Sequence, residues 1–321
     1  MNHFISCDWG TTNLRCRVID SKAFEIIAED QSDQGIAATY DRWTQSGKPE
    51  SERVAFFQQI LANSIKKLSN SSSFDLSKLP VIISGMASST IGMMDLPYKP
   101  LPQPNNGSGL VMQKIEGTMG MSNPVYLISG LCTSDDVLRG EETLLAGIDD
   151  SISKGEHMIL FPGTHSKHIR IQDGLIIDFK TYMTGEFFKL LSTSSILKNT
   201  IDLSAADSFD AESFAQGVLS AADNNLLNTS FIVRTNSLFK KCTESQNYFY
   251  LSGLLIGTEF SELSESAYSI QLVVNDRLKE PYILALDVLN INLINVTSSR
   301  DAIIRGQWNI FNAHKDIPTR S

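Results

Sequence analysis

The chain contains few of the features that mark secreted, metal-binding or membrane-spanning proteins. It has four cysteines in 321 residues, and no two of them form a Cys-x-x-Cys pair, so neither a zinc site nor a set of structural disulfides is expected. No uninterrupted apolar run approaches the roughly 18 residues of a membrane helix. The first residues also lack the basic segment and long apolar core of a secretory signal peptide. These absences predict a cytoplasmic protein.

A surplus of positive charge is also missing. The 27 basic residues are outnumbered by 36 acidic ones, which gives a net charge of −9 and argues against a general surface for nucleic acid or an anionic membrane. An anionic small molecule needs only a local basic pocket. The apolar fraction of 42% and the length are those of a globular protein with two domains. We expect a small-molecule ligand, and a homodimer is one open alternative for the assembly.

What the chain does contain is one short pattern in two copies. Gly10 and Gly163 are each followed by threonine, and each Gly-Thr pair follows an apolar run and precedes an alternating one. This pattern predicts a strand, a tight turn and a second strand. Glycine lets the backbone come close to a ligand, and the N–H groups of a turn form a concave binding site for an anion. Two such turns facing each other would hold a polyphosphate, so the repetition predicts a nucleotide site.

Local patterns predict two α/β halves, each of which opens with a β-hairpin. In the first half, strands are predicted at 4–9, 14–20, 24–30, 81–84 and 125–128, and a helix at 51–68. In the second half, strands are predicted at 158–161, 168–172, 175–182, 270–274 and 291–296, with helices at 141–148, about 248–263, up to about 289 and from 300 onward. A loop that runs into a helix is expected after Gly85. The two halves imply α/β domains at 1–135 and 136–321 that face one cleft.

The first copy of the pattern, Asp8-x-Gly10-Thr11-Thr12, resembles the first phosphate motif of the actin/sugar-kinase/Hsp70 ATPase superfamily, and the Gly163-Thr164 hairpin resembles the second. A longer series of segments resembles the 2-dehydro-3-deoxygalactonokinase family, also called 2-keto-3-deoxygalactonate kinase. In chain order these segments are 8–15, 85–86 with 97–98, 139–143, 162–167, 183–186 and 251–257. The resemblance implies two actin-like (ribonuclease H-like) α/β domains, with the sugar acid bound on the N-terminal side and the nucleoside on the C-terminal side.

The same resemblance implies an activity. It is the ATP-dependent phosphorylation of the 6-hydroxyl of 2-dehydro-3-deoxy-D-galactonate or a closely related sugar acid, with ATP and Mg²⁺ as cofactors. The chain departs from the family at Asn275-Asp276-Arg277, where a Gly-Thr element usually follows the strand. A non-catalytic sugar-acid or nucleotide-binding paralogue is therefore the alternative, and an actin-like ATPase is a third hypothesis.

Asp8 is the candidate metal ligand, because it ends a strand that is otherwise bound for the core. A lone carboxylate there is costly to desolvate, and a magnesium ion that bridges phosphates would offset this cost; a turn-capping aspartate is the alternative. The cofactor-binding candidates are the residues of the two turns, a nearby cation, and two glycines that the resemblance places against adenosine although their spacing equally fits helix packing: Gly10, Thr11, Thr12, Gly163, Thr164, Lys167, Gly253 and Gly257.

Phosphoryl transfer to a hydroxyl also needs a carboxylate that accepts its proton. In related sugar kinases an acidic base lies in a Gly-acid-polar string before the second phosphate motif, and Gly140-Glu141-Glu142 occupies a similar place. Glu141 is the first candidate and Glu142 the second, because adjacent helical residues point about 100° apart; a plain partner of the helix dipole is the alternative. The substrate-binding candidates are Asn13, Arg15, Gly85, Met86, Ser88, Thr184 and Glu186.

Overall fold

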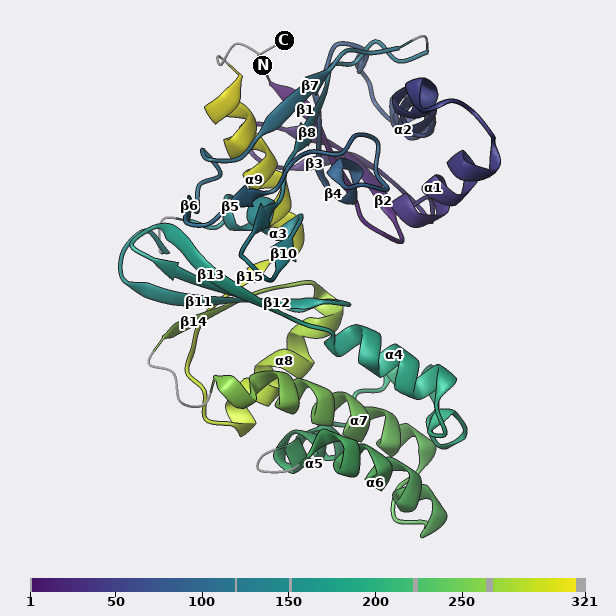
Figure 1. Ribbon diagram of the computed structural model, residues 1–321, viewed down its shortest axis with the longest axis vertical. Coiled ribbons are helices and arrows are strands. Elements are labelled where there is room, and N and C mark those ends of the chain that lie inside the picture. The colour runs from purple at the N-terminus through teal and green to yellow at the C-terminus, as the bar shows by residue number, and fades with distance from the viewer. Residues whose placement is uncertain (1, 119, 150–151, 222–224, 264–267, 316–321) are drawn as a thin grey trace. The chain divides into compact units, whose positions relative to one another are not determined.

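The computed structural model describes residues 2–118, 120–149, 152–221, 225–263 and 268–315 (Figure 1). The chain divides into two compact units. The first unit holds residues 1–155, 171–178 and 299–321, and the second unit holds residues 156–170 and 179–298. The whole of the second unit is therefore inserted in the sequence of the first.

The first unit is built on a mixed six-stranded sheet with the strand order β3-β2-β1-β4-β8-β7. The opening hairpin is confirmed: β1 and β2 are antiparallel, so that Asp8 lies opposite Arg15. Strand β1 is parallel to β4, and β4 is parallel to β8. The bounds are β1 (His3–Trp9), β2 (Leu14–Asp20), β3 (Ile26–Ser32), β4 (Val81–Gly85), β7 (Met112–Ile115) and β8 (Val125–Ile128).

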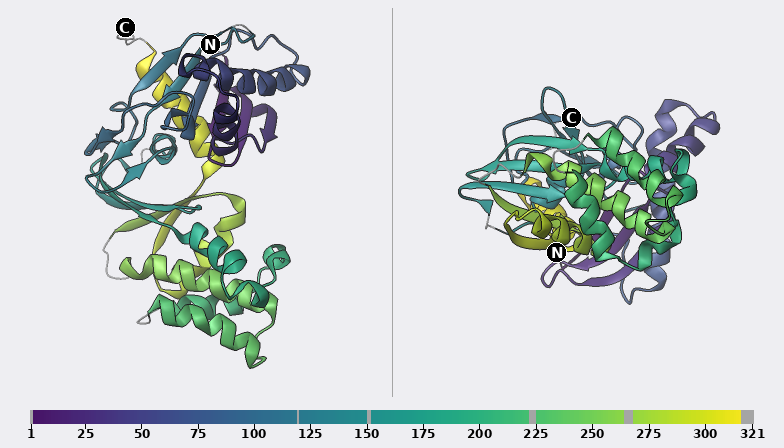
Figure 2. Two further views of the ribbon diagram at one scale, coloured as in Figure 1. Left: turned by 45° about the vertical axis from the view of Figure 1, so that its right-hand side comes forward. Right: turned by 90° about the horizontal axis from the view of Figure 1, so that it is seen from below.

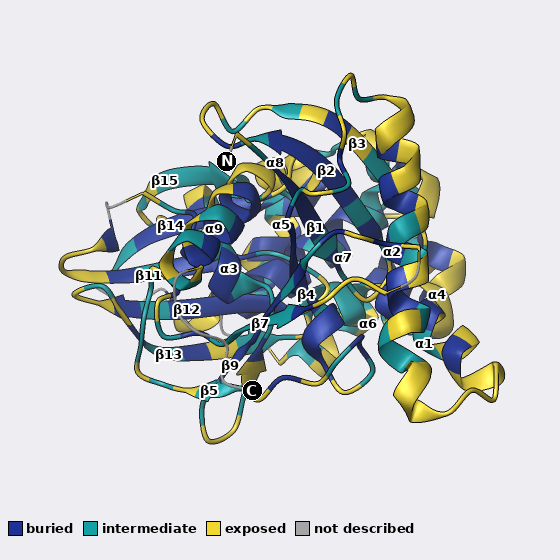
Figure 3. Ribbon diagram, turned by 90° about the horizontal axis from the view of Figure 1, so that it is seen from above, coloured by how far each residue is buried: buried dark blue, intermediate teal, exposed yellow. Residues whose placement is uncertain are grey.

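The alternation of side chains along β1 explains which helices cover which face of this sheet. Successive residues of a strand point to opposite faces. Cys7 and Trp9 share a buried apolar cluster with Phe57 of α2 (Arg53–Asn70) and Trp43 of α1 (Ile36–Gln45). Figure 3 shows the central strands buried and the outer sides of α1 and α2 exposed.

The opposite face of β1 carries Phe4, whose ring stacks on Trp308 of α9 (Ser299–His314) at 4.8 Å between centroids. Gln307 of α9 donates from Nε2 to the carbonyl of Cys7 and to the hydroxyl of Ser84, both at 2.9 Å. These contacts attach the last described helix to the first sheet.

The compact units differ from the domains expected at 1–135 and 136–321, because α9 and the segment 136–155 lie in the first unit. The physical reason is the packing of α3 (Glu141–Leu145) on α9. A Cβ on Gly147 would lie 1.8 Å from the carbonyl oxygen of Ala302, and a Cβ on Gly306 would lie 1.8 Å from that of Thr143. The two backbones are therefore in direct contact, and α3 stays with the unit that holds α9.

The prediction of a loop that runs into a helix after Gly85 is wrong. A single 3-10 turn, η2 (Met86–Ser88), follows β4, and an irregular loop comes next. Backbone hydrogen bonds from Met93 N to Ala87 O at 2.7 Å and from Leu96 N to Ser88 O at 3.0 Å fold this loop back on η2. The loop leads to a small three-stranded sheet of β5 (Lys99–Pro100), β9 (Leu131–Cys132) and β10 (Val137–Leu138).

A second six-stranded sheet has the order β15-β14-β11-β12-β13-β6. The hairpin predicted at Asp173-Gly174 is confirmed, and these two residues have φ of +48° and +77°, as a type I′ turn requires. The hairpin tip, 171–178, belongs to the first unit, where β13 pairs with β6. The bounds are β6 (Gln103–Pro104), β11 (Glu156–Phe161), β12 (Ser166–Gln172), β13 (Leu175–Tyr182), β14 (Ser269–Val274) and β15 (Leu293–Ser298).

The helices of the second unit surround α7, most of whose residues are buried. Figure 2 shows the green helices of this unit gathered side by side. Their bounds are α4 (Thr184–Ser194), α5 (Ala211–Ala221), α6 (Leu226–Leu238), α7 (Glu244–Glu259) and α8 (Asp276–Val288). The predicted mixed α/β class is thus confirmed in both units. Within the described ranges, no helix combines the length and the apolar character needed to cross a bilayer.

Candidate active site

The first Gly-Thr turn joins β1 to β2 and is held by the beginning of α1. Gly10 N donates to Asn13 O at 3.0 Å within the turn. The carbonyl oxygens of Gly10, Thr11 and Thr12 accept hydrogen bonds, at 2.9, 3.1 and 3.2 Å, from the backbone N–H groups of three consecutive residues, Ile36, Ala37 and Gly35 respectively. The carbonyls of the turn are therefore occupied by α1, a helix that the sequence analysis missed.

Two N–H groups of the same turn are available to bind a ligand. In the described part of the chain, the N–H groups of Thr11 and Thr12 have no hydrogen-bond partner. Gly10 has no positive φ, and a Cβ on it would meet nothing closer than Asn13 O at 3.8 Å. Neither the backbone conformation nor the packing thus requires glycine here. A glycine that the fold does not need leaves room for a ligand to approach the backbone.

The second Gly-Thr turn joins β11 to β12 and is likewise held by the beginning of a helix. Glu186 N of α4 donates to Thr164 O at 3.1 Å, and Gly163 N donates to Ser166 Oγ at 3.4 Å. Gly163 also has no positive φ, and the nearest atom to a Cβ on it would be His165 O at 3.7 Å. A Cβ on Gly185 would lie 2.7 Å from Gly163 O, so the helix packs directly on the turn.

The repetition is therefore larger than the sequence pattern suggested. Each Gly-Thr turn carries its own helix N-terminus, and each helix brings a glycine against the turn. A Cβ on Gly35 would lie 2.2 Å from the carbonyl carbon of Thr12, which is the counterpart of the contact made by Gly185. Spacing alone gave no signal for Gly35, because the glycine contacts a turn that lies more than 20 residues earlier in the chain.

Asp8 and Arg15 face each other beside the first turn. Arg15 Nη1 donates to Asp8 Oδ2 at 3.3 Å, and Arg15 Nε donates to Gln31 Oε1 at 3.3 Å. Burial raises the pKa of Asp8, and the charges of Arg15 and Arg17 oppose this shift. The carboxylate is thus compensated by Arg15 in this structure. Its other oxygen, Oδ1, would lie 3.8 Å from a Cβ on Gly85, which places the end of β4 beside the carboxylate.

Glu142 lies close to the same strand ends. Gly85 ends β4 with φ of +90°, Gly140 precedes α3 with φ of +114°, and a Cβ on Gly140 would lie 3.6 Å from Gly85 Cα. The buried Glu142 accepts a hydrogen bond from Gly140 N at 2.7 Å and another from the hydroxyl of Thr143 at 3.0 Å. Burial and the neighbouring Glu141 raise the pKa of Glu142 from 4.5 to about 7.

Glu141 has a different environment. It is half-buried, and its Oε2 accepts a hydrogen bond from Arg139 N at 3.2 Å. The structure therefore separates the two candidate bases, since Glu142 alone combines full burial with a pKa near neutrality. A general base works best when its pKa is near the working pH.

Arg139 connects this carboxylate pair to the loop after β4. Its guanidinium donates to Ser88 Oγ at 2.6 Å, Leu96 O at 3.2 Å and Tyr98 OH at 3.3 Å, and it lies 4.2 Å from the centroid of the Tyr98 ring. Ser88 is buried, and its hydroxyl donates to Ile128 O at 2.6 Å. The observed contacts of Ser88 therefore hold the loop, whereas its neighbour Met86 is half-buried. Arg139 is a residue to which the sequence analysis gave no role.

The candidates of the second unit have partners of their own. The ammonium of Lys167 is buried and donates to the hydroxyl of Thr181 on β13. Thr184, the first residue of α4, donates its hydroxyl to Glu259. Glu186 and His165 lie 2.5 Å apart between Oε2 and Nε2, and both side chains are partly exposed.

The placement of Gly253 and Gly257 against adenosine is wrong. Both glycines of α7 are buried against α5, where a Cβ would lie 2.0 Å from Phe214 O and 2.7 Å from Val218 O respectively. Their spacing is therefore that of close helix packing, which leaves no free surface for a base. The segment at Asn275 begins α8, and the Asn275 side chain accepts a hydrogen bond from Leu278 N at 3.1 Å as an N-cap.

The residues present are compatible with a magnesium ion held in part by phosphate. Among the described residues, no three or more histidine, cysteine or acidic side chains are grouped as a metal site. Magnesium commonly takes only one or two protein carboxylates, together with water and phosphate oxygens. Asp8 supplies one carboxylate, of which only Oδ2 is hydrogen-bonded to Arg15.

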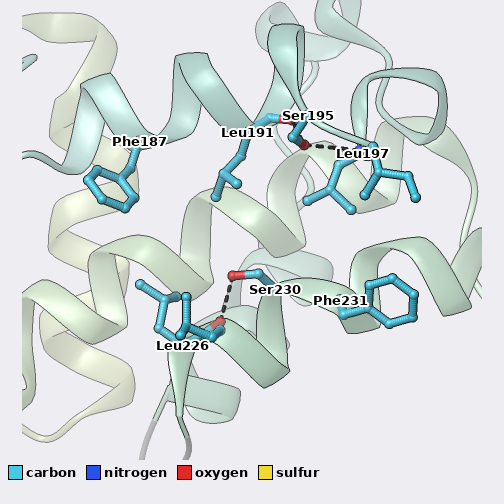
Figure 4. A pocket seen from close by; sticks show the side chains of 9 residues that line it. Phe187, Leu191, Ser195, Leu197, Leu226, Ser230 and Phe231 are labelled. Atoms are coloured by element: carbon cyan, nitrogen blue, oxygen red, sulfur yellow. Dashed lines mark hydrogen bonds between the residues drawn. The ribbon is translucent and has the colours of Figure 1, made fainter.

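A separate cavity of about 220 Å³ opens between α4 and α6 in the second unit. Figure 4 shows the side chains that line it, which include Phe187, Leu191, Leu226 and Phe231. The lining contains apolar side chains and two serines, and it holds no titratable group. Phosphates and sugar acids need donors and charge, so this cavity is not part of the candidate site.

Known proteins match the chain along nearly its whole length. The family model described as 2-keto-3-deoxy-galactonokinase matches residues 8–310. A protein of Rhizobium meliloti (strain 1021) with the name probable 2-dehydro-3-deoxygalactonokinase is 28% identical over 302 residues, which are 91% of each chain. The 2-dehydro-3-deoxygalactonokinase of Escherichia coli (strain K12) is 27% identical over 302 residues, 91% of this chain and 92% of that one.

A solved structure is similar to the same extent. It is a crystal structure from Sinorhizobium meliloti of a protein provisionally assigned as a 2-dehydro-3-deoxygalactonokinase, and it matches with a TM-score of 0.82 at 27% identity. The match covers 99% of this chain and 98% of that chain.

Proposed function

Because the chain belongs to the 2-keto-3-deoxy-galactonokinase family, whose members are phosphotransferases, we propose that it transfers a phosphoryl group from ATP to the 6-hydroxyl of 2-dehydro-3-deoxy-D-galactonate. The observation that carries the ATP part of this proposal is the doubled turn. Gly10 and Gly163 are glycines that neither conformation nor packing requires, and a helix N-terminus binds the carbonyls of residues 10–12 in the first turn and that of Thr164 in the second. In the first turn this leaves the N–H groups of Thr11 and Thr12 for an anion.

The residues of the first unit divide the chemistry among them. Asp8 would hold Mg²⁺ through its carboxylate, and the ion supplies charge neutralisation for the phosphates when bound. The N–H groups of Thr11 and Thr12 bind phosphate oxygens. Arg15 lies beside Asp8 at 3.3 Å and orients an anionic group of the nucleotide or of the sugar acid.

We assign the general base to Glu142 in preference to Glu141. The raised pKa of Glu142, about 7, lets its carboxylate accept the proton of the hydroxyl at neutral pH. Gly140 N and the Thr143 hydroxyl hold the side chain in place, and Arg139, three residues before Glu142, is anchored to Ser88 of the loop after β4. Glu141 contributes a neighbouring negative charge that helps to raise the pKa of Glu142.

The activity is tested by measuring ADP release with Mg-ATP and a panel of 2-dehydro-3-deoxy sugar acids. Turnover that depends on the galactonate derivative, with NMR detection of the phosphate on the 6-oxygen, is the expected result. Binding of the sugar acid in a calorimeter without turnover would favour a non-catalytic paralogue. ADP release that does not depend on any sugar acid would favour an ATPase.

Gly10→Ala and Gly163→Ala are each expected to raise the KM for Mg-ATP by about tenfold or more, because the new methyl group occupies the space that a phosphate needs. Both positions accommodate a Cβ without a contact shorter than 3.7 Å, so the melting temperature should stay within about 2 °C of wild type. The measurements are steady-state kinetics and differential scanning calorimetry. An unchanged KM for Mg-ATP in both variants would remove the turns from the nucleotide site.

A further inference from the structure

One buried carboxylate of the second unit has no role in the chemistry described above. Glu259, at the end of α7, is 3% exposed. It accepts hydrogen bonds from three side chains on three different elements: His168 Nε2 of β12 at 3.0 Å, the Tyr282 hydroxyl of α8 at 2.9 Å, and the Thr184 hydroxyl of α4. Glu259 therefore joins four elements at one point.

Two routes lead from this carboxylate to the second Gly-Thr turn. On the first route, Gly163 N donates to Ser166 Oγ at 3.4 Å, and Ser166 Oγ lies 3.0 Å from the Tyr282 hydroxyl, which donates to Glu259. On the second route, Thr184 begins the helix whose next residue, Gly185, packs on the turn. The position of the turn thus depends on Glu259 from two sides.

The proton order along the first route is fixed by chemistry. A carboxylate only accepts, so the Tyr282 hydroxyl donates to Glu259 and its oxygen is left to accept from Ser166, whose own oxygen accepts from Gly163 N. Burial and the nearby Glu259 charge raise the pKa of Tyr282 well above its ordinary value, so the hydroxyl keeps the proton that it donates. The network has one direction, from the turn to the carboxylate.

A contribution to stability alone does not explain why the Glu259 carboxylate is buried. Taking a charge out of water is costly even when it is hydrogen-bonded, and apolar side chains of similar volume often serve a core as well or better. The aromatic ring of Phe260 packs against the network, with its centroid 5.5 Å from that of Tyr282 and 5.9 Å from that of His168. A fully apolar cluster would bury the same space, but it would leave Gly163 N and the hydroxyl of Thr184 without this common anchor.

We propose that Glu259 is a positioning residue for the nucleotide: it sets the second Gly-Thr turn and the first turn of α4 in the geometry that binds phosphate. The proposal rests on the function proposed above for this turn. Glu259 acts through Ser166, Tyr282 and Thr184, and it touches neither substrate. Its removal should therefore weaken the binding of ATP and leave the binding of the sugar acid unchanged.

The test compares Glu259→Gln and Tyr282→Phe with the control Asn247→Ala in the full chain. A glutamine presents an amide N–H₂ to a group that already donates, and a phenylalanine keeps the ring and removes the one hydroxyl. Asn247 also lies on α7 and is fully buried, but it donates to Thr200 O and Val233 O, away from the turn. The control variant therefore also loses buried hydrogen bonds, but these bonds are not linked to Gly163.

Glu259→Gln is expected to raise the KM for Mg-ATP by about tenfold or more, and Tyr282→Phe by about three- to fivefold, because small displacements of binding groups are costly. The KM for the sugar acid should stay within about twofold. Asn247→Ala should lower the urea midpoint and leave both KM values at wild type. KM values for Mg-ATP that equal those of Asn247→Ala in both test variants would show a merely structural role and overturn the proposal.

Failure of the proposed function gives a different result. In that case wild type shows no turnover with any sugar acid, and Mg-ATP binding measured by calorimetry replaces the KM. Weaker binding of Mg-ATP by Glu259→Gln than by Asn247→Ala would still support the positioning role, and equal binding would refute it. If Glu259→Gln does not fold, Tyr282→Phe decides the question, because it retains the carboxylate and the aromatic packing.

Discussion

Glu142→Gln is expected to lower kcat by a factor of about 10² to 10⁴, the range that a positioned general base contributes. The side chain keeps its length and volume, and the amide oxygen still accepts one of the two hydrogen bonds now donated by Gly140 N and Thr143. The fold should be retained, and the KM for Mg-ATP should change little. Steady-state kinetics and near-UV circular dichroism provide the measurements.

The same substitution should lower kcat but raise the free energy of unfolding. The folded-state pKa of Glu142 is raised from 4.5 to about 7, so between these two values the unfolded chain loses its proton first. Below about pH 4.5, Glu142 is protonated in both states and does not change the free energy of unfolding. As the pH rises toward 7, it lowers the free energy of unfolding by at most roughly 3 kcal/mol. Urea unfolding of Glu142→Gln should show a gain of about 1–3 kcal/mol at pH 8 and little gain at pH 4.5.

The matched control is Glu141→Gln, which removes the half-buried neighbour. We expect a loss of kcat below about tenfold, and a shift of the kinetic pKa to lower pH, because the charge of Glu141 helps to raise the pKa of Glu142. In wild type, kcat/KM should rise with pH through about 7. Full turnover in Glu142→Gln together with a large loss in Glu141→Gln would return the role of base to Glu141.

Gly35→Ala is expected to reduce kcat/KM for Mg-ATP by about 100-fold, the loss that follows a displacement of about 1 Å at a binding group. A Cβ on Gly35 would lie within 2.2–2.6 Å of backbone atoms of Thr11, Thr12 and Asn13, and backbone atoms cannot rotate away as a side chain can. The first turn or the beginning of α1 must therefore move. Initial rates at varied Mg-ATP, with urea unfolding beside them, measure both effects.

Two comparisons separate displacement of the turn from general destabilisation. Gly185→Ala places a Cβ 2.7 Å from Gly163 O and should disturb the second turn in the same way. Gly47→Ala replaces a glycine at φ of +65° that has no atom within 4 Å of a Cβ, so it introduces backbone strain alone. A wild-type KM for Mg-ATP in both Gly35→Ala and Gly185→Ala would show that the helix contacts do not position the turns.

The parts of the fold that could be predicted were those with a local signal. The two Gly-Thr hairpins, the Asp173-Gly174 turn and the buried strands follow from residue type and alternation within a few positions. The helix α1 was missed, although Ile36, Tyr40 and Trp43 have helical spacing, because its other residues are small or polar and Gly35 gives no side-chain N-cap. The return of α9 to the first sheet has no local signal at all.

The candidate site shows the same limit. Gly253 and Gly257 have a spacing that fits either helix packing or a flat surface for a ligand, and only the neighbouring helix α5 decides between them. The choice between Glu141 and Glu142 depends on how a short helix is rotated, and no pattern of one sequence contains that angle. The network around Glu259 joins residues from 166 to 282, so the sequence separates what the structure brings together.

The position of α9 has a consequence for the order in which the chain folds during synthesis. A ribosome releases residues 3–145 long before residues 299–314, so the first sheet emerges without the partner of Phe4 and without the donor to Cys7 O and Ser84. The inserted second unit has all of its strands and helices by residue 298. The first unit thus begins to emerge first and gains its last helix only after the second unit, and until residues 299–314 have emerged the face of its sheet that carries Phe4 lacks this cover.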